Sequence, residues 1–244
     1  MVVLVTGGSR GIGTSAVRAL HRDGADVIFT YERNAEKAAA LAAELGERAA
    51  AVQCDLARYD ELPALVDECV ARHGRIDALV NNAAIFEENA FFGNDYAAWQ
   101  RGWQRTFAVN LFGTVNLTYL VLQHMRAQGS GKIVNVVSRA AHRGELSVAD
   151  YGASKAALVN FTKSIARACG PYGIKAVAIA PGFIETDMAG PDLATRRSEL
   201  EAEVPLGYIG SADEVGEIVA FFASPRGDYA NGATIDVNGG SYVR

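Results

Sequence analysis

A tyrosine and a lysine four residues apart, Tyr151 and Lys155, have the clearest chemical potential in this sequence. The segment is expected to begin a helix, and a four-residue spacing puts both side chains on one helix face. A phenol with a pKa of about 10 exchanges protons poorly at neutral pH, and a neighbouring cation favours its ionised form. We therefore predict that Lys155 lowers the pKa of Tyr151, which then serves as a proton donor or acceptor. The same spacing also arises by chance on ordinary helices.

Two polar residues in apolar surroundings are further candidates. Ser138 ends a predicted strand at its carboxyl edge, where ligands bind in open α/β sheets, so its hydroxyl could hold a carbonyl oxygen. Alternatively, it caps its own loop. Asn110 interrupts an apolar helical stretch, and a buried amide needs partners. It either satisfies backbone groups of the core or holds a water that connects Lys155 to solvent.

A glycine-rich segment, Thr6-Gly7-Gly8-Ser9-Arg10-Gly11-Ile12-Gly13, lies between a predicted strand and a predicted helix. Glycines allow a tight turn close to a pyrophosphate, and the N–H groups and dipole of a helix N-terminus attract its charge. The spacing is G-x-x-x-G-x-G, and the alternative is a plain strand-to-helix turn. The expected cofactor contacts in this segment are Gly7, Ser9, Arg10, Gly11, Ile12 and Gly13.

The end of the second predicted strand bears on which dinucleotide binds. An acid there favours a free ribose 2′-hydroxyl, and a cation favours a 2′-phosphate. Tyr31 stands where the acid is expected, Glu32 follows it, and Arg33 and Arg10 could bracket a phosphate. NADP(H) is therefore the favoured cofactor, with Tyr31 and Arg33 as contacts. NAD(H) is the alternative if Glu32 turns inward.

The elements that must position these residues alternate along the chain between short β-branched runs and longer helical patterns. This order predicts the α/β class: a doubly wound, seven-stranded parallel sheet of the Rossmann type with helices on both faces, in one domain spanning residues 1–244. Residues 181–205 have no clear period, so we expect a loop with one short helix, in which about 183–204 form a substrate lid. The expected strands are 2–5, 27–30, 50–53, 78–81, 132–137, 175–179 and 234–237. The expected helices are 12–23, 34–45, 60–73, 97–127, 151–169 and 212–224, the last capped by Ser211.

Composition limits the classes of partner. The 244 residues are 50% hydrophobic and carry a net charge of -5, which argues against disorder and against nucleic acid as a partner. Cys54, Cys69 and Cys169 lack metal-ligand or redox spacing, so no metal is expected and a reducing, cytoplasmic location fits best. The sequence shows neither a targeting segment nor an apolar run of about 20 residues, so no membrane association is expected.

Taken together, these motifs resemble the compact, single-domain short-chain dehydrogenases/reductases over the whole chain. Thr6 to Gly13 is similar to the family's T-G-x-x-x-G-x-G, Asp55-Leu56 to its adenine-contacting pair, and Asn81-Asn82-Ala83-Ala84 to its N-N-A-G. Ala84 departs from the glycine usual there. The resemblance implies that the catalytic residues are Asn110, Ser138, Tyr151 and Lys155. It implies further cofactor contacts at Asp55, Leu56, Asn82, Ala83, Ala84, Tyr151, Lys155, Pro181, Gly182, Ile184 and Thr186.

The resemblance also implies a reaction: hydride transfer to a ketone, with Lys155 also binding the nicotinamide ribose and Asn110 supporting a water relay. A 3-oxoacyl thioester is the leading substrate. The alternatives are an alcohol, sugar or polyketide ketoreductase and a non-catalytic NADP(H)-sensing module. A homotetramer through helices 97–127 and 151–169 is expected. Arg139, His142 and Arg143 either face an anionic or polar substrate or lie on a solvated loop; a carrier-docking patch would draw on Arg126, Arg139, Arg143 and Arg167.

Overall fold

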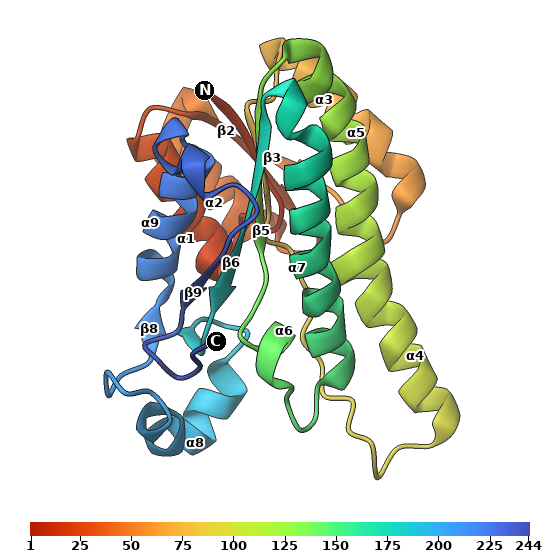
Figure 1. Cartoon of the computed structure of the whole chain (residues 1–244), viewed down its shortest axis with the longest axis vertical. Helices are drawn as coiled ribbons and strands as arrows, with labels where there is room; N and C mark the ends of the chain where they lie inside the picture. Colours follow the sequence, from red (N-terminus) through yellow and green to blue (C-terminus); the bar gives the residue numbers. More distant parts are fainter.

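Seven parallel strands form the centre of the molecule in the computed structural model (Figure 1), which describes residues 1–190 and 193–244. The strand order is β3-β2-β1-β4-β5-β6-β9, so the chain winds outward from β1 and then crosses to β4. This reversal creates a ligand-binding crevice at the carboxyl ends of the strands. The predicted fold class is confirmed. The strands are β1 (Val2–Val5), β2 (Asp26–Tyr31), β3 (Ala49–Gln53), β4 (Ala78–Asn81), β5 (Gly131–Val136), β6 (Ile174–Pro181) and β9 (Thr234–Val237).

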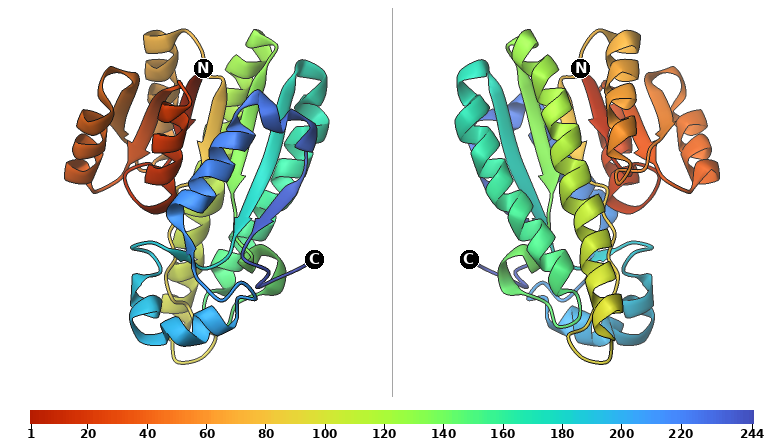
Figure 2. Two further views of the ribbon diagram at one scale, coloured as in Figure 1. Left: turned by 90° about the vertical axis from the view of Figure 1, so that its left-hand side faces the viewer. Right: turned by 90° about the vertical axis from the view of Figure 1, so that its right-hand side faces the viewer.

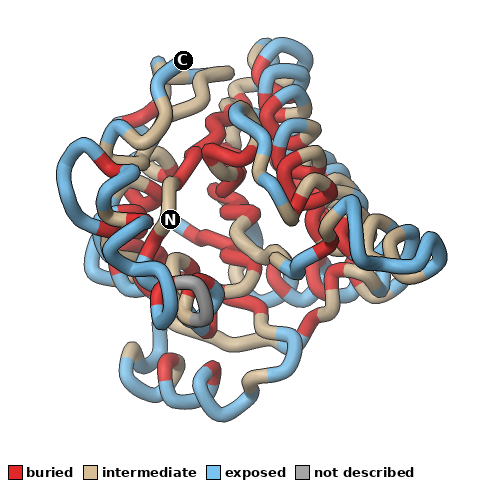
Figure 3. Tube along the Cα trace, turned by 90° about the horizontal axis from the view of Figure 1, so that it is seen from below, coloured by how far each residue is buried: buried red, intermediate tan, exposed pale blue. Residues whose placement is uncertain are grey.

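Helices cover both faces of this sheet (Figure 2). One face carries α1 (Gly11–Arg22), α2 (Ala35–Leu45) and α9 (Ala212–Ala223), and the other carries α3 (Leu62–His73), α4 (Tyr96–Phe107), α5 (Thr114–Gln128) and α7 (Ala149–Cys169). Alternate residues of β1 enter two separate hydrophobic clusters, one for each face. Because both faces are covered, the inner strands β1, β4 and β6 are almost entirely buried apolar runs, and they lie in the buried centre in Figure 3.

One predicted helix contains a π-helical stretch in the structure. The expected helix over 97–127 consists of α4 and α5, joined by a π-helical stretch at Ala108–Gly113. Gly113 lies so close to the Leu56 carbonyl that a side chain there would collide with it. The stretch contains Asn110, and such π-helical insertions often occur at functional sites. The predicted helix is confirmed, but its π-helical stretch was not predicted, because hydrophobic period alone does not reveal a one-residue slip in the backbone ladder.

The segment between β6 and α9 lies beyond the strand ends, beside the short helix α6 (Ala140–Arg143), which the sequence analysis did not predict (Figure 1). It contains the paired two-residue strands β7 (Ile184–Glu185) and β8 (Gly210–Ser211), and the expected short helix is α8 (Gly190–Ala202). The predicted cap of α9 is confirmed: the Ser211 hydroxyl accepts from Glu214 N at 3.2 Å, and the Glu214 carboxylate accepts from Ser211 N at 2.7 Å.

Within the described ranges, none of the helices combines the length and apolar character that crossing a bilayer requires. The described residues also hold no group of three or more His, Cys, Asp or Glu side chains arranged to bind a metal ion.

Candidate active site

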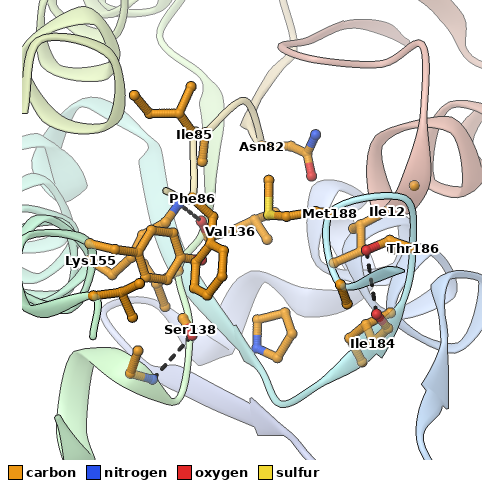
Figure 4. A pocket seen from close by; sticks show the side chains of 18 of the residues that line it. Ile12, Asn82, Ile85, Phe86, Val136, Ser138, Lys155, Ile184, Thr186 and Met188 are labelled. Atoms are coloured by element: carbon orange, nitrogen blue, oxygen red, sulfur yellow. Dashed lines mark hydrogen bonds between the residues drawn. The ribbon is translucent and has the colours of Figure 1, made fainter. Parts of the chain in front are cut away.

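A cavity of about 500 Å³ opens at the carboxyl ends of the strands, and Figure 4 shows it from close by. Its volume is in the range of small-molecule and cofactor sites. The walls come from loops that are far apart in sequence but adjacent at this edge of the sheet. The expected site residues that line it are Gly7, Arg10, Gly11, Ile12, Gly13, Asp55, Leu56, Asn82, Ala83, Ala84, Ser138, Tyr151, Lys155, Pro181, Gly182, Ile184 and Thr186.

The glycine segment forms one end of this cavity. Gly7 and Gly11 have φ angles of 66° and 54°, in the left-handed region that favours glycine. A Cβ at Gly13 would collide with the carbonyl oxygen of Gly7 and lie 2.7 Å from Asn82 Nδ2. α1 begins at Gly11, with no side-chain cap and no acid in its first turn. This loop therefore offers a helix N-terminus to an anion, as a dinucleotide pyrophosphate requires.

Asn82 supports the same loop from the neighbouring strand. Its Nδ2 donates to the carbonyl oxygens of Thr6 at 3.0 Å and Gly7 at 3.1 Å. The Thr6 hydroxyl in turn accepts from the N–H groups of Asn82 and Ala83, both at 3.0 Å. Asn82 was expected as a cofactor contact. It lines the cavity and also holds the loop that would bind the phosphates.

The far end of the cavity corresponds to the adenosine half of a dinucleotide, and here the placement differs from expectation. Among the described lining residues are Arg10 and Glu32, but neither Tyr31 nor Arg33. Arg33 instead pairs with Glu32 at 3.1 Å and is largely exposed. Ser9 lines an adjacent cavity that also contacts Arg10. Residues directly after a strand alternate in direction, so a one-residue difference decides which one faces the crevice.

The central wall brings together the predicted tyrosine, lysine and serine. Tyr151 and Lys155 are buried on one face of α7, and Lys155 Nζ lies 5.6 Å from the centroid of the Tyr151 ring. Nζ donates to the carbonyl oxygen of Val136 at 2.9 Å (Figure 4). Ser138 lies two residues beyond the end of β5, and its hydroxyl accepts from Ala140 N at 3.1 Å. The predicted convergence of these three side chains is confirmed.

The expected change in the phenol is not found. Burial raises the pKa of Tyr151 to about 12, although a hydrogen bond with Ser138 acts in the opposite direction. Burial also lowers the pKa of Lys155 to about 8. The prediction that Lys155 lowers the pKa of Tyr151 is therefore wrong for this arrangement. Desolvation is the largest cause of both shifts, because it penalises the charged form of each group.

Asn110 lies behind this wall, in the π-helical stretch, and does not line the cavity among the described residues. Its Oδ1 accepts from Ile85 N at 2.8 Å, and its Nδ2 donates to Ile85 O at 3.0 Å. Nδ2 also lies 3.4 Å from Ser154 Oγ. Asn110 thus satisfies backbone groups, which was one of the two interpretations of the sequence. The water relay stays a prediction.

Several lining residues were not identified from the sequence. The Phe86 ring packs edge-on against Tyr151, with centroids 5.0 Å apart, and Phe183 and Met188 line the wall opposite. No motif marks these positions, because an apolar residue in a loop has the same appearance whether it faces a cavity or the core.

The sequence analysis also did not identify Asp150, which lies behind the cavity wall directly before Tyr151. Its buried carboxylate accepts from Thr106 Oγ1 at 2.9 Å and from Tyr151 N at 2.9 Å, which anchors the start of α7.

The charged and polar side chains that could face the substrate or a carrier protein lie in different environments. Arg139 is buried and lines the cavity. It therefore does not lie on a solvated loop, and it cannot form part of a surface patch that docks a carrier protein. The ring of His142 stacks on Tyr242, with centroids 6.1 Å apart. Arg126 lies over the ring of Tyr172, 4.9 Å from the centroid, away from the described cavity lining.

Comparisons with known proteins agree with this site. The family model for short chain dehydrogenases matches residues 1–197. The chain is 35% identical to the 3-oxoacyl-(acyl-carrier-protein) reductase FabG of Staphylococcus epidermidis, with 98% of each covered. It is 36% identical to the short-chain reductase protein NovJ of Streptomyces niveus, with 98% of this chain and 93% of that protein covered.

A solved structure from Brucella melitensis, titled short-chain dehydrogenase/reductase SDR:Glucose/ribitol dehydrogenase, superposes with a TM-score of 0.90 at 33% identity. That comparison covers 100% of this chain and 97% of the other. The chain belongs to the short-chain dehydrogenase/reductase family. It is an oxidoreductase that acts on C=O and CH–OH groups.

Proposed function

We propose that this protein reduces a ketone with NADPH, using Tyr151 as the proton donor. The observation that supports the proposal is the shared cavity: the Tyr151 phenol, the Ser138 hydroxyl and the Lys155 ammonium line the same space as the glycine loop. That space has the phosphate-binding features of a dinucleotide site at one end and proton-transfer groups at its centre.

A bound reduced nicotinamide would supply a hydride to the carbonyl carbon of the substrate. The protein's contribution lies at the carbonyl oxygen. The Ser138 hydroxyl holds this oxygen, and the Tyr151 hydroxyl donates its proton to it as negative charge develops. A phenol whose pKa is raised to about 12 is fully protonated at neutral pH, so Tyr151 begins in the form that a reduction requires.

Lys155 compensates the charge that remains on Tyr151 after the proton leaves. Its ammonium lies 5.6 Å from the ring centroid in a buried site, where electrostatic attraction is stronger than in water. In our proposal it also binds the nicotinamide ribose. Asn110 keeps the Ile85 segment in place and supports the water relay that restores the proton through Lys155.

Replacement of the phenol tests this function. We expect Tyr151→Phe to retain NADPH affinity within about twofold and to lose at least about a hundredfold in turnover, because the proton donor is removed. The matched control is Tyr172→Phe, since Tyr172 is well exposed and lies outside the described cavity lining. Turnover of the Tyr151 variant within a few-fold of the wild type would contradict the proposal.

NADP(H) is the proposed cofactor because Arg10 lines both the main cavity and the adjacent one, which Lys37 also lines. Glu32 would oppose a 2′-phosphate, but Arg33 pairs with its carboxylate at 3.1 Å. Dissociation constants measured by fluorescence titration should show tighter binding of NADPH than of NADH. Arg10→Ala should weaken NADPH binding about tenfold with little effect on NADH, whereas a wild-type preference for NADH would refute the assignment.

A 3-oxoacyl thioester is the proposed substrate class, on the similarity to the staphylococcal reductase across 98% of each chain. Residues 1–244 would act as one catalytic unit with 183–204 as the lid. A sugar or other polyol ketone is the second candidate. The name of the Brucella melitensis structure and the charged residues of the cavity wall favour it. Comparison of acetoacetyl thioesters with ketoses would distinguish the two.

We also propose a homotetramer built through α4, α5 and α7. Large hydrophobic side chains are exposed along this helical region: Tyr96 on α4, Phe112 on the π-helical stretch and Tyr119 on α5. Exposed aromatic groups of this kind mark interaction surfaces. Light scattering at micromolar concentration should give four times the chain mass of 25.9 kDa, and a monomer would contradict the assembly.

A further inference from the structure

Arg139, the residue directly after Ser138, is enclosed but incompletely hydrogen-bonded. It is 3% exposed, it lines the cavity, and its buried Nη1 has no hydrogen-bond partner. An unpaired buried donor destabilises a protein, and the cost is larger when the group is charged. An unsatisfied donor in the wall of a substrate cavity points to a ligand atom that satisfies it.

The rest of the guanidinium is held firmly. Its Nη2 donates to Glu203 Oε2 at 3.2 Å, and its Nε lies 3.6 Å from Glu145 Oε1. Its Cζ lies 4.8 Å from the centroid of the Phe183 ring. These contacts fix the orientation of Arg139 and leave Nη1 as a buried nitrogen without a hydrogen-bond partner.

The surrounding charges favour a neutral acceptor. Arg143 shares both carboxylates, at 3.6 Å from Glu145 and 3.5 Å from Glu203, so two cations and two anions balance. A substrate carboxylate brought to Arg139 would also approach these two glutamates and be repelled by them. An ester or thioester carbonyl oxygen carries no net charge and avoids that repulsion.

The position of Arg139 limits where this acceptor lies in the substrate. Ser138 and Arg139 are consecutive in the chain and both line the cavity, so both can contact one small molecule. We propose that Arg139 is a specificity residue whose Nη1 donates to a second, neutral carbonyl oxygen of the ketone substrate, such as that of a 3-oxo ester or thioester.

This assignment rests on the proposed ketone reduction. Because Nη1 is shielded from solvent, the acceptor reaches it through a shift of Phe183 or Glu203. Both residues lie in the proposed lid, so substrate recognition would accompany lid movement.

The test compares two ketones that differ at one group: ethyl acetoacetate, and 4-ethoxybutan-2-one, which lacks the second carbonyl. The readout is the ratio of their kcat/KM values with NADPH. We expect a ratio of about ten or more in the wild type, because a hydrogen bond to a charged donor is lost with the ether. Arg139→Met should reduce the ratio to about one. Arg139→Lys, which keeps a cation beside the glutamates, should also reduce it strongly.

Arg143→Met is the matched control, since it removes a partner from the same two glutamates and should preserve the ratio. Thermal unfolding of each variant checks that the fold persists. A wild-type ratio near one, an unchanged ratio in Arg139→Met, or a preference for free acetoacetate over its ethyl ester would each overturn the proposal.

Calorimetry separates failure of this inference from failure of the proposed function. Absence of turnover with any ketone would refute the proposed reduction. Under the inference, ethyl acetoacetate would still bind the NADP⁺-saturated wild type about tenfold more tightly than Arg139→Met. Equal binding to both proteins would overturn the role of Arg139 whether or not turnover is observed.

Discussion

The glycine loop and the segment at residues 183–204 both line the cavity but are held in place differently. The loop follows β1, in which every residue is buried. Asn82 Nδ2 donates to the loop carbonyls of Thr6 and Gly7, and the Thr6 hydroxyl accepts from Asn82 N and Ala83 N. The opposite segment has a small apolar cluster of its own, including Leu193, Leu200 and Val204. Much of its further attachment consists of ion pairs at the surface, such as Lys37 with Asp187 at 2.8 Å.

This difference corresponds to the two tasks of the site. A cofactor pocket that serves every turnover benefits from a rigid backbone, because preorganised donors need no rearrangement when the ligand binds. A lid must open and close, and exposed ion pairs contribute little to stability, so they can be broken at small cost.

The largest effect in this comparison is expected from Gly13→Ala. The added methyl would collide with Gly7 O and crowd Asn82 Nδ2, lowering the free energy of unfolding by about 1–3 kcal/mol and weakening NADPH binding. The matched control, Gly190→Ala at the start of α8, has open space around the new Cβ and should change stability by less than about 0.5 kcal/mol. Urea unfolding and fluorescence titration measure both. Similar losses of stability and NADPH affinity in the two variants would contradict the difference between the glycine loop and the lid segment.

An intermediate effect should appear in the pH dependence of stability, because the rigid wall contains a buried cation. Burial lowers the pKa of Lys155 from 10.5 to about 8, so between these values the unfolded chain binds more protons than the native protein. Stability conferred by this site should therefore rise from about pH 8 to 10.5 and be lost as the pH falls through 8. Urea unfolding at pH 7, 8, 9 and 10 should show wild-type stability rising relative to Lys155→Met. A constant difference between the two proteins would refute the assignment.

The smallest effect is expected from the surface pair on the lid side. The Lys37 and Asp187 side chains are 54% and 60% exposed, so Lys37→Met and Asp187→Asn should each change the free energy of unfolding by less than about 1 kcal/mol. Their double-mutant coupling should decrease further in 1 M salt, where exposed charges are screened. A coupling energy that is large and independent of salt would show that this pair holds the lid as firmly as backbone bonds hold the loop.

The sequence predicted the strands of the sheet to within about two residues at each end. Apolar runs with β-branched residues define such strands because each is buried on both faces, and this requirement is visible residue by residue. It did not predict the π-helical stretch at Ala108–Gly113. There the backbone slips by one residue to accommodate contacts with Leu56 and Ile85, which come from distant parts of the chain.

Residue types and local spacing by themselves determined the glycine loop, the common face of Tyr151 and Lys155, and the order of the elements, since each depends on neighbours a few positions away. Only the tertiary structure decided that Glu32 rather than Tyr31 lines the crevice and that Arg139 is enclosed by Glu145, Glu203 and Phe183. It likewise decided the pKa of Tyr151, because burial depends on every segment packed around the phenol. Desolvation and long-range contacts arise only when separate parts of the chain meet, and no local pattern contains them.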